Sequence, residues 1–227
     1  STTAVRSIYD ISMTYTKPTF IATGDSSTER IISSVDGTTW TGTLTPQTFS
    51  TSVFAVASAG TYDVPTITSK FAIAGGSGGN TLAFSYDLSL WQGLGATTFT
   101  TQCNNAVWNG SLWVGVGSGG NTLAYSTDGF TWTGLTTTVF GTNGFNVAWN
   151  DSIWVAVGNG TNTIAYSLNG IAWTVLSTTF ITTAGYGIAW NGSNLWMAVG
   201  SGTNRFATSP NGSVWTARGA GPTTTMF

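Results

Sequence analysis

The sequence predicts an all-β fold on three observations. Thr, Ser, Gly, Val and aromatic residues dominate the 227-residue chain, and 41% of its residues are hydrophobic. Short segments with period-2 alternation are separated by turn residues, a pattern typical of antiparallel strands. Five repeats end in tryptophans spaced 51, 41, 41 and 42 residues apart. Because a propeller blade has four strands in ~40–45 residues, the five repeats predict a five-bladed β-propeller with four antiparallel strands per blade.

The clearest repeat reads AVWNGSLWVGVGSGGNTLAYSTDGFTWTG over residues 106–134. Similar copies cover 147–175 and 188–217, and two diverged copies cover 19–42 and 70–93. In the copy at 106–134 the alternation predicts four strands, at Ala106–Trp108, Leu112–Val116, Thr122–Ser126 and Phe130–Leu135.

A single domain over residues 1–227 is expected, with blades at about 5–45, 50–95, 104–137, 145–178 and 186–220. An insertion around ASAGTYDVP lengthens the first interval. The segment 221–227 contains TTTMF, which matches TTTVF at 136–140, and is expected to link blades. The chain then starts and stops at a blade boundary, so that packing between blades closes the ring.

An acidic or amide residue precedes glycine in four of the five repeats, in the turn before the closing tryptophan. The five positions are Asp36, Asp87, Asp128, Asn169 and Asn211. Asp-Gly and Asn-Gly favour type I′ hairpins, whose central residues both need positive φ. Because a turn accepts Asn in place of Asp and a general acid or metal ligand does not, these five residues are predicted to be structural.

These turns resemble the Asp-box, or BNR, repeat of sialidase-type propellers. The likeness runs from Ser126 through Asp128, Gly129 and Thr131 to Trp132, with one residue fewer between Asp and Trp. In that family the box is structural and lies between the third and fourth strands. The whole chain is also similar to Trp-, Gly- and Thr-rich arrays in proteins of large DNA viruses and phages, which implies a virion or host-surface context.

Charge excludes one class of partner and favours another. Only 6% of residues are charged and the net charge is −2. Nucleic-acid binding needs clustered Lys and Arg, and the chain has six in total. No apolar run reaches the ~20 residues that cross a bilayer, so no membrane insertion is expected. A weakly charged surface favours association with other molecules.

The face with the longer loops is the expected binding face, because variable loops usually carry sites. Asn80, Asn121, Asn162 and Asn204 recur in its Gly-rich loops. The first repeat departs from this pattern and places Asp25, Glu29 and Arg30 there. For those three, a solvated loop or an ion pair between subunits is the alternative to a binding role.

Catalysis is disfavoured by the residues themselves. The chain contains no His, so histidine-dependent triads and metal centres are unavailable. A glycosidase pair would have to join the single Glu29 with an Asp. The Gly-rich loops lack the helix and Lys of a phosphate loop. No cofactor and no metal site is expected, and Cys103 is alone.

The sequence therefore predicts a non-catalytic propeller for structure or recognition, on a virion surface or in an extracellular assembly. Its expected partners are copies of itself or a neighbouring structural protein. The alternative is a lectin whose repeated sites bind glycans, with asparagine amides and aromatic faces as the contacts. A glycosidase-like enzyme is a remote third possibility. The eleven tryptophans are expected mainly to pack between blades.

Overall fold

The structure is a computed structural model that describes residues 8–13, 20–25, 30–42, 48–64, 67–176 and 180–219. Side chains are described in all of these except 8–13, 59–64 and 67–70. Twenty β-strands account for the regular structure of the described residues. The prediction of an all-β fold is confirmed. Glu29 and the segment 221–227 lie outside the described residues.

The strands form five successive groups of four, which we call units 1 to 5. Unit 1 consists of β1 (Ile8–Met13), β2 (Phe20–Gly24), β3 (Ile31–Ser34) and β4 (Thr41–Gly42). Unit 2 consists of β5 (Val53–Val64), β6 (Ile67–Gly76), β7 (Leu82–Ser85) and β8 (Gln92–Gly93). Unit 3 consists of β9 (Gln102–Trp108), β10 (Trp113–Ser118), β11 (Leu123–Ser126) and β12 (Thr133–Gly134).

Units 4 and 5 repeat this pattern closely. Unit 4 consists of β13 (Asn143–Trp149), β14 (Trp154–Asn159), β15 (Ile164–Ser167) and β16 (Thr174–Val175). Unit 5 consists of β17 (Ala184–Trp190), β18 (Trp196–Ser201), β19 (Phe206–Ser209) and β20 (Thr216–Ala217).

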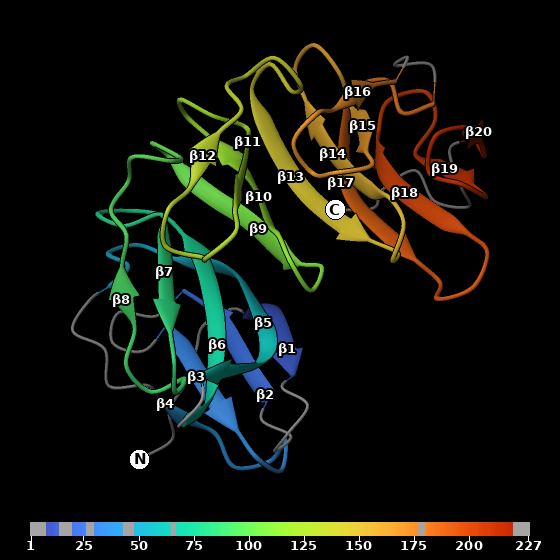
Figure 1. Ribbon diagram of the computed structural model, residues 1–227. Coiled ribbons are helices and arrows are strands. Elements are labelled where there is room, and N and C mark those ends of the chain that lie inside the picture. The colour runs from blue at the N-terminus through green and yellow to red at the C-terminus, as the bar shows by residue number, and fades with distance from the viewer. Residues whose placement is uncertain are drawn as a thin grey trace.

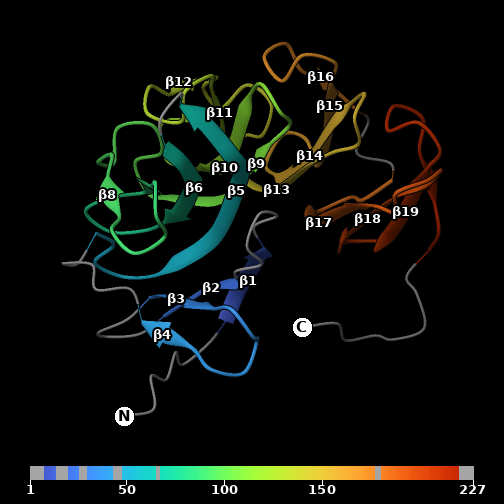
Figure 2. The ribbon, with the colours of Figure 1, turned by 60° about the horizontal axis from the view of Figure 1, so that its bottom comes forward.

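Each unit is an antiparallel sheet in which the strands pair in chain order. The first strand of each unit lies toward the middle of the molecule and the fourth at the outer edge (Figure 1). The units follow one another around a common centre in both views (Figures 1 and 2). Single bridges join neighbouring units at equivalent places, namely Ser77–Gln102, Ser118–Asn143 and Asn159–Ala184.

The strands of unit 3 differ in length from the sequence expectation. The first strand begins at Gln102, four residues before the expected Ala106. The fourth comprises only Thr133–Gly134. The N–H groups of Phe130 and Thr131 both bind the Asp128 carboxylate, so these residues belong to the turn and not to the strand. Hydrophobic alternation does not reveal that competition for backbone donors.

The insertion in the first interval extends a hairpin. In unit 2 the pairing of β5 with β6 continues from Val53–Gly76 to Val64–Ile67, whereas the hairpins of other units are shorter. The insertion therefore lengthens two existing strands and adds no new element to the described residues.

Hydrophobic cores lie between neighbouring units. Trp113, Trp154 and Trp196 are almost fully buried. Each packs against the tryptophan that ends the preceding strand, with ring centroids 5.1, 4.9 and 5.3 Å apart. One cluster combines Val114 of unit 3 with Trp154 of unit 4. All eleven tryptophans lie in described residues and none is classed as exposed, which agrees with the expected packing role.

In units 3 to 5, the glycine of the third–fourth turn packs against the unit before it. A Cβ on Gly129 would lie 2.6 Å from the Phe71 ring, and one on Gly170 would lie 2.6 Å from Leu112. Gly212 approaches Val155 in the same way. Only glycine fits at such a close approach with positive φ. These turns therefore fix the spacing between successive units.

In unit 5, the face equivalent to the covered face of unit 4 has no turn of a following unit packed against it among the described residues. Leu195 and Met197 take the places of Ile153 and Val155, but they are 37% and 44% exposed. Among the described residues, only Phe20 of its own unit lies within 4 Å of a Cβ on Gly37. The expected closure of the ring thus stays a prediction.

Candidate functional site

In the Ser-x-Asp and Ser-x-Asn turns, side-chain oxygens accept hydrogen bonds from backbone N–H groups of the same turn. In unit 3 the Ser126 hydroxyl oxygen accepts the N–H of Gly129 at 2.8 Å. Asp128 Oδ1 accepts the N–H groups of Phe130 and Thr131 at 2.8 and 2.7 Å. The same pattern recurs at Asp36, Asp87, Asn169 and Asn211. One oxygen of each side chain therefore organises the turn.

The prediction that these turns are of type I′ is wrong. Positive φ occurs at the glycines, such as Gly129 at 79°, but not at the preceding Asp or Asn. In unit 2, Leu88 adopts φ 67° at the glycine position. The side-chain bonds from Ser and Asp replace the second positive-φ residue as the cause of the reversal. A dipeptide signal cannot reveal those longer-range bonds within the turn.

The hydrogen bonds also keep these carboxylates ionised. The N–H groups of Thr39 and Thr38 and the Ser34 hydroxyl lower the pKa of Asp36 well below its usual range. Partial burial acts to raise the pKa of Asp128, but its backbone and hydroxyl donors outweigh that effect and lower the pKa. The pKa of Asp87 is lowered by the same balance. A carboxylate with such a pKa is a poor proton donor at neutral pH.

The recurring asparagines make hydrogen bonds to the loops that connect neighbouring units. Asn121 donates to the Thr98 carbonyl at 2.6 Å and accepts the Thr136 N–H at 2.8 Å. It thus joins the connection that enters its unit to the connection that leaves it. Asn80 makes the same two kinds of bond, and Asn162 donates to the Val139 carbonyl. Asn204 occupies the equivalent loop of unit 5. Their proposed role in ligand binding stays a prediction, and it would need atoms that these bonds already use.

Asp25 and Arg30 flank the unusual loop of unit 1. Arg30 donates to the Thr51 and Ser50 carbonyls at 2.7 and 3.1 Å, so it anchors the connection to unit 2. Asp25 is partly buried, and its Oδ1 has no hydrogen-bond partner among the described residues. The structure therefore gives Arg30 a structural contact. Glu29 lies outside the described residues, so the expected grouping of these three residues stays a prediction.

Cys103 is a packing residue in the core between units 2 and 3. Burial raises the pKa of its thiol to about 12, so the nucleophilic thiolate is scarce at neutral pH. Within the described ranges, no three His, Cys, Asp or Glu side chains gather in a way that could hold a metal ion. No helix in those ranges could span a membrane.

A β-bulge in the first strand of every unit was missed by sequence reasoning. The skipped residues are Tyr9, Phe54, Asn104, Phe145 and Tyr186. The Phe145 and Tyr186 rings meet across the unit boundary at 5.3 Å. Asn104 donates to the Gly144 carbonyl of the next unit. Bulges re-aim side chains, and here they bring residues of successive inner strands into contact.

Large exposed apolar side chains gather on the third–fourth turns, the face where the sequence predicts only short hairpins. Leu168, Val35 and Val214 are 73%, 67% and 64% exposed. Four further turn residues in this group are Tyr86, Leu90, Phe130 and Ile171. Sequence reasoning could have found them as the large apolar residues at turn positions that hold Thr or Ser in other repeats.

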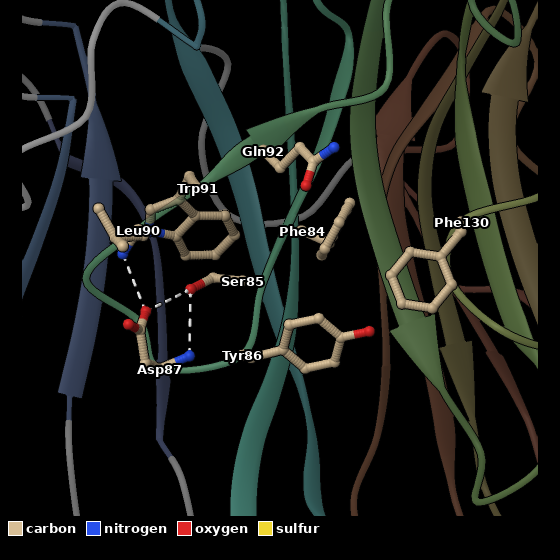
Figure 3. Close-up of a pocket in the computed structure, with 8 residues that line it drawn as sticks. All are labelled: Phe84, Ser85, Tyr86, Asp87, Leu90, Trp91, Gln92 and Phe130. Atoms are coloured by element: carbon tan, nitrogen blue, oxygen red, sulfur yellow. Dashed lines mark hydrogen bonds between the residues drawn. The ribbon is translucent and has the colours of Figure 1, made fainter.

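One groove stands out on this face. Its volume is about 580 Å³, and Phe84, Tyr86, Asp87, Trp91 and Gln92 of unit 2 line it together with Phe130 of unit 3. In Figure 3 the Tyr86 hydroxyl points toward the Phe130 ring. Phe84 and Phe130 meet edge to face, with centroids 4.6 Å apart and planes 84° apart. The groove thus has an aromatic corner and a polar edge.

Solved structures with a similar fold define the class of protein. A chain of the Nidogen/Laminin complex matches with TM-score 0.62 and 14% identity, over 89% of this chain and 75% of that one. The WD40 beta propeller domain of Doa1 matches with TM-score 0.57 and 9% identity, over 89% and 64%. YCF48 bound to D1 peptide matches with TM-score 0.53 and 14% identity, over 79% and 57%. The chain is therefore an all-β, propeller-like repeat protein.

No protein-family model and no curated protein matches the sequence. At these identities the structural likeness defines the fold alone. The functional assignment rests on the residues described above.

Proposed function

We propose that the chain is a non-catalytic five-bladed β-propeller, with one blade per unit and Asp-box-like turns, that assembles with copies of itself or a neighbouring structural protein. The contact surface is the face of the third–fourth turns. We place the assembly on a virion surface or in the extracellular space, in keeping with the low charge of the chain.

The exposed apolar side chains on these turns carry the proposal. Large apolar groups such as Leu168 and Val35 stay in water unless another surface covers them. Their turns are short and held by internal hydrogen bonds, so binding would cost little ordering entropy. Two of the similar structures are themselves complexes, of nidogen with laminin and of YCF48 with the D1 peptide, and this supports a binding role by analogy.

The absence of His from the sequence and the use of the turn carboxylates in hydrogen bonds support a non-catalytic role. A glycosidase-like activity would need Glu29 and an Asp as a catalytic pair. No arrangement of the described residues favours such an activity. The lectin alternative gains support from the aromatic groove, which lies at one junction between units and not in the repeated loops where the sequence predicts sites.

Light scattering of the purified chain over a concentration series tests the assembly. We expect the wild type to associate as its concentration rises. The triple variant Val35→Thr, Leu168→Thr and Val214→Thr should remain monomeric, and each change copies a residue that another repeat carries at that position, Thr127 or Thr131. Val175→Ala, which removes an exposed valine of the outer strand β16, is the matched control and should associate like the wild type.

A wild type that stays monomeric at every concentration and binds no copy of itself would contradict self-assembly. If association persists in the triple variant but is lost when Leu195 and Met197 are made polar, the open face of unit 5 is the contact and the turn face is not.

A further inference from the structure

The groove between units 2 and 3 is formed where the repeat pattern breaks. Tyr86 stands where the other units carry Val35, Thr127, Leu168 and Pro210. Gln92 stands where each of the other units has Thr. Phe130 occupies a position that holds Thr or Ser in three other units. These departures meet at one junction, so the groove is a local feature and not a consequence of the repeat.

The aromatic side of the groove suits the C–H face of a saturated ring. Tyr86 is 47% and Phe130 is 37% exposed, whereas Phe84 lies beneath them at 8%. Their planes are inclined by 45° to 84°. Aromatic faces are electron-rich and attract weakly positive C–H groups. Inclined rings form a corner rather than the parallel slot that would hold a flat aromatic ligand.

The polar side of the groove suits hydroxyl groups. Among the described residues, neither the Gln92 amide nor the Tyr86 hydroxyl takes part in a hydrogen bond. The printed turn bonds from Ser85, Ser89 and Leu90 all go to Asp87 Oδ1. A purely apolar occupant would leave such groups unpaired, at a cost in free energy.

The charge and the size of the groove limit the chemical classes of ligand that would fit it. The groove contains one carboxylate and no Lys or Arg, so it does not favour phosphate or acidic sugars. Its volume of about 580 Å³ falls in the range of small-molecule sites, roughly 300–1,000 Å³. A neutral sugar offers both an apolar C–H face and a rim of hydroxyls, which matches the two sides of the groove.

We propose that the groove between units 2 and 3 binds a neutral pyranose sugar, whose C–H face packs on Tyr86 and Phe130 and whose hydroxyls bind Gln92 and Asp87. This site goes beyond the proposed assembly and does not depend on it. One small site gives a weak affinity, of the order of millimolar.

Saturation-transfer NMR with glucose, galactose, mannose, N-acetylglucosamine and lactose tests the site on the full chain. We expect transfer to the ring C–H protons of at least one of these sugars. The variants Tyr86→Thr, Phe130→Ser and Gln92→Thr, each built from residues of other repeats, should lower the affinity about tenfold or more. Val175→Ala, at an exposed position of β16 outside the groove, is the control and should bind like the wild type.

Circular dichroism and thermal unfolding verify that each variant is folded. Failure of all five sugars to receive saturation from the wild type would overturn the proposal, as would unchanged binding in folded Tyr86→Thr and Phe130→Ser. Binding of an apolar peptide at the groove in place of any sugar would also overturn it. Light scattering of the same samples reports assembly separately, so loss of one proposal leaves the other measurable.

Discussion

At the scale of single residues, the Asp or Asn of each third–fourth turn acts through its oxygen. Asn169 Oδ1 accepts the N–H groups of Ile171 and Ala172 at 3.0 and 2.8 Å, as Asp128 does for Phe130 and Thr131. The difference is that the aspartates can be protonated. Since their folded-state pKa is lowered, their stabilising contribution is complete above the unfolded-state pKa of about 4 and is lost as pH falls below it.

The triple variant Asp36→Asn, Asp87→Asn and Asp128→Asn should therefore lose less stability in acid than the wild type. The amide keeps the oxygen acceptor but does not titrate, so the free energy of unfolding near pH 7 should change little. Urea unfolding followed by tryptophan fluorescence at pH 7 and pH 3 measures the effect. Parallel losses in both proteins between these pH values would contradict it.

Residue-scale reasoning from the sequence predicted that these five residues are structural, and the hydrogen bonds agree with that role. It was wrong about the type I′ geometry, because the Ser and Asp side-chain acceptors replace a second positive φ. The loop asparagines show the other limit. Their partners, such as Thr98 for Asn121, lie 23 residues away, and no local pattern reveals such a bond.

At the scale of elements, the turn glycine of units 3 to 5 sets how closely each of these units approaches the preceding one. Gly129 has φ +79° and its Cβ position lies against the Phe71 ring of the preceding unit. Gly37 has φ +73°, but among the described residues only Phe20 is near, at 3.7 Å. The two sites share the backbone strain and differ in the contact between units.

Gly129→Ala should therefore destabilise the protein more than Gly37→Ala. Both changes introduce strain at positive φ, costing about 1 kcal/mol. Gly129→Ala adds overpacking against Phe71, typically ~1–3 kcal/mol more. Urea unfolding of the two variants beside the wild type gives the difference. Equal losses would mean that the turn does not pack on the neighbouring unit.

Element lengths were less predictable than element order. The alternation and turn residues indicate four strands per repeat, and the structure has four in each unit. The ends of the strands depend on which group takes each backbone N–H, so β12 is only Thr133–Gly134. The β-bulges of the first strands also escape detection, because a skipped residue such as Phe145 reads in the sequence as part of the same apolar alternation.

At the scale of the whole molecule, each unit is covered by the next one, and unit 5 is the exception. Val155 of unit 4 is fully buried, whereas Met197 at the equivalent place in unit 5 is 44% exposed. Clusters such as the one joining Val114 to Trp154 cross the unit boundary, so neighbouring units stabilise one another.

We expect Met197→Ser to lower the free energy of unfolding by less than about 0.5 kcal/mol, because the side chain is already largely in water. Val155→Ser should cost roughly 2–4 kcal/mol, through lost burial and an unpaired hydroxyl. Thermal and urea unfolding compare the two. A large loss from Met197→Ser would show that in solution another surface covers unit 5, either unit 1 closing the ring or a second copy.

By itself the sequence determined the all-β character and the order of the four strands within each repeat, and it predicted a structural role for the Ser-x-Asx turns with which the hydrogen bonds agree. All three follow from local periodicity and turn chemistry. Only the tertiary structure showed that loop asparagines such as Asn121 make hydrogen bonds to the connections between units. It also showed that exposed apolar side chains lie on the face of the third–fourth turns. It alone brought Phe130 of unit 3 beside Phe84 and Tyr86 of unit 2. The physical reason is that these features depend on contacts between units, and a residue's neighbours across such a boundary are set by packing rather than by adjacent sequence.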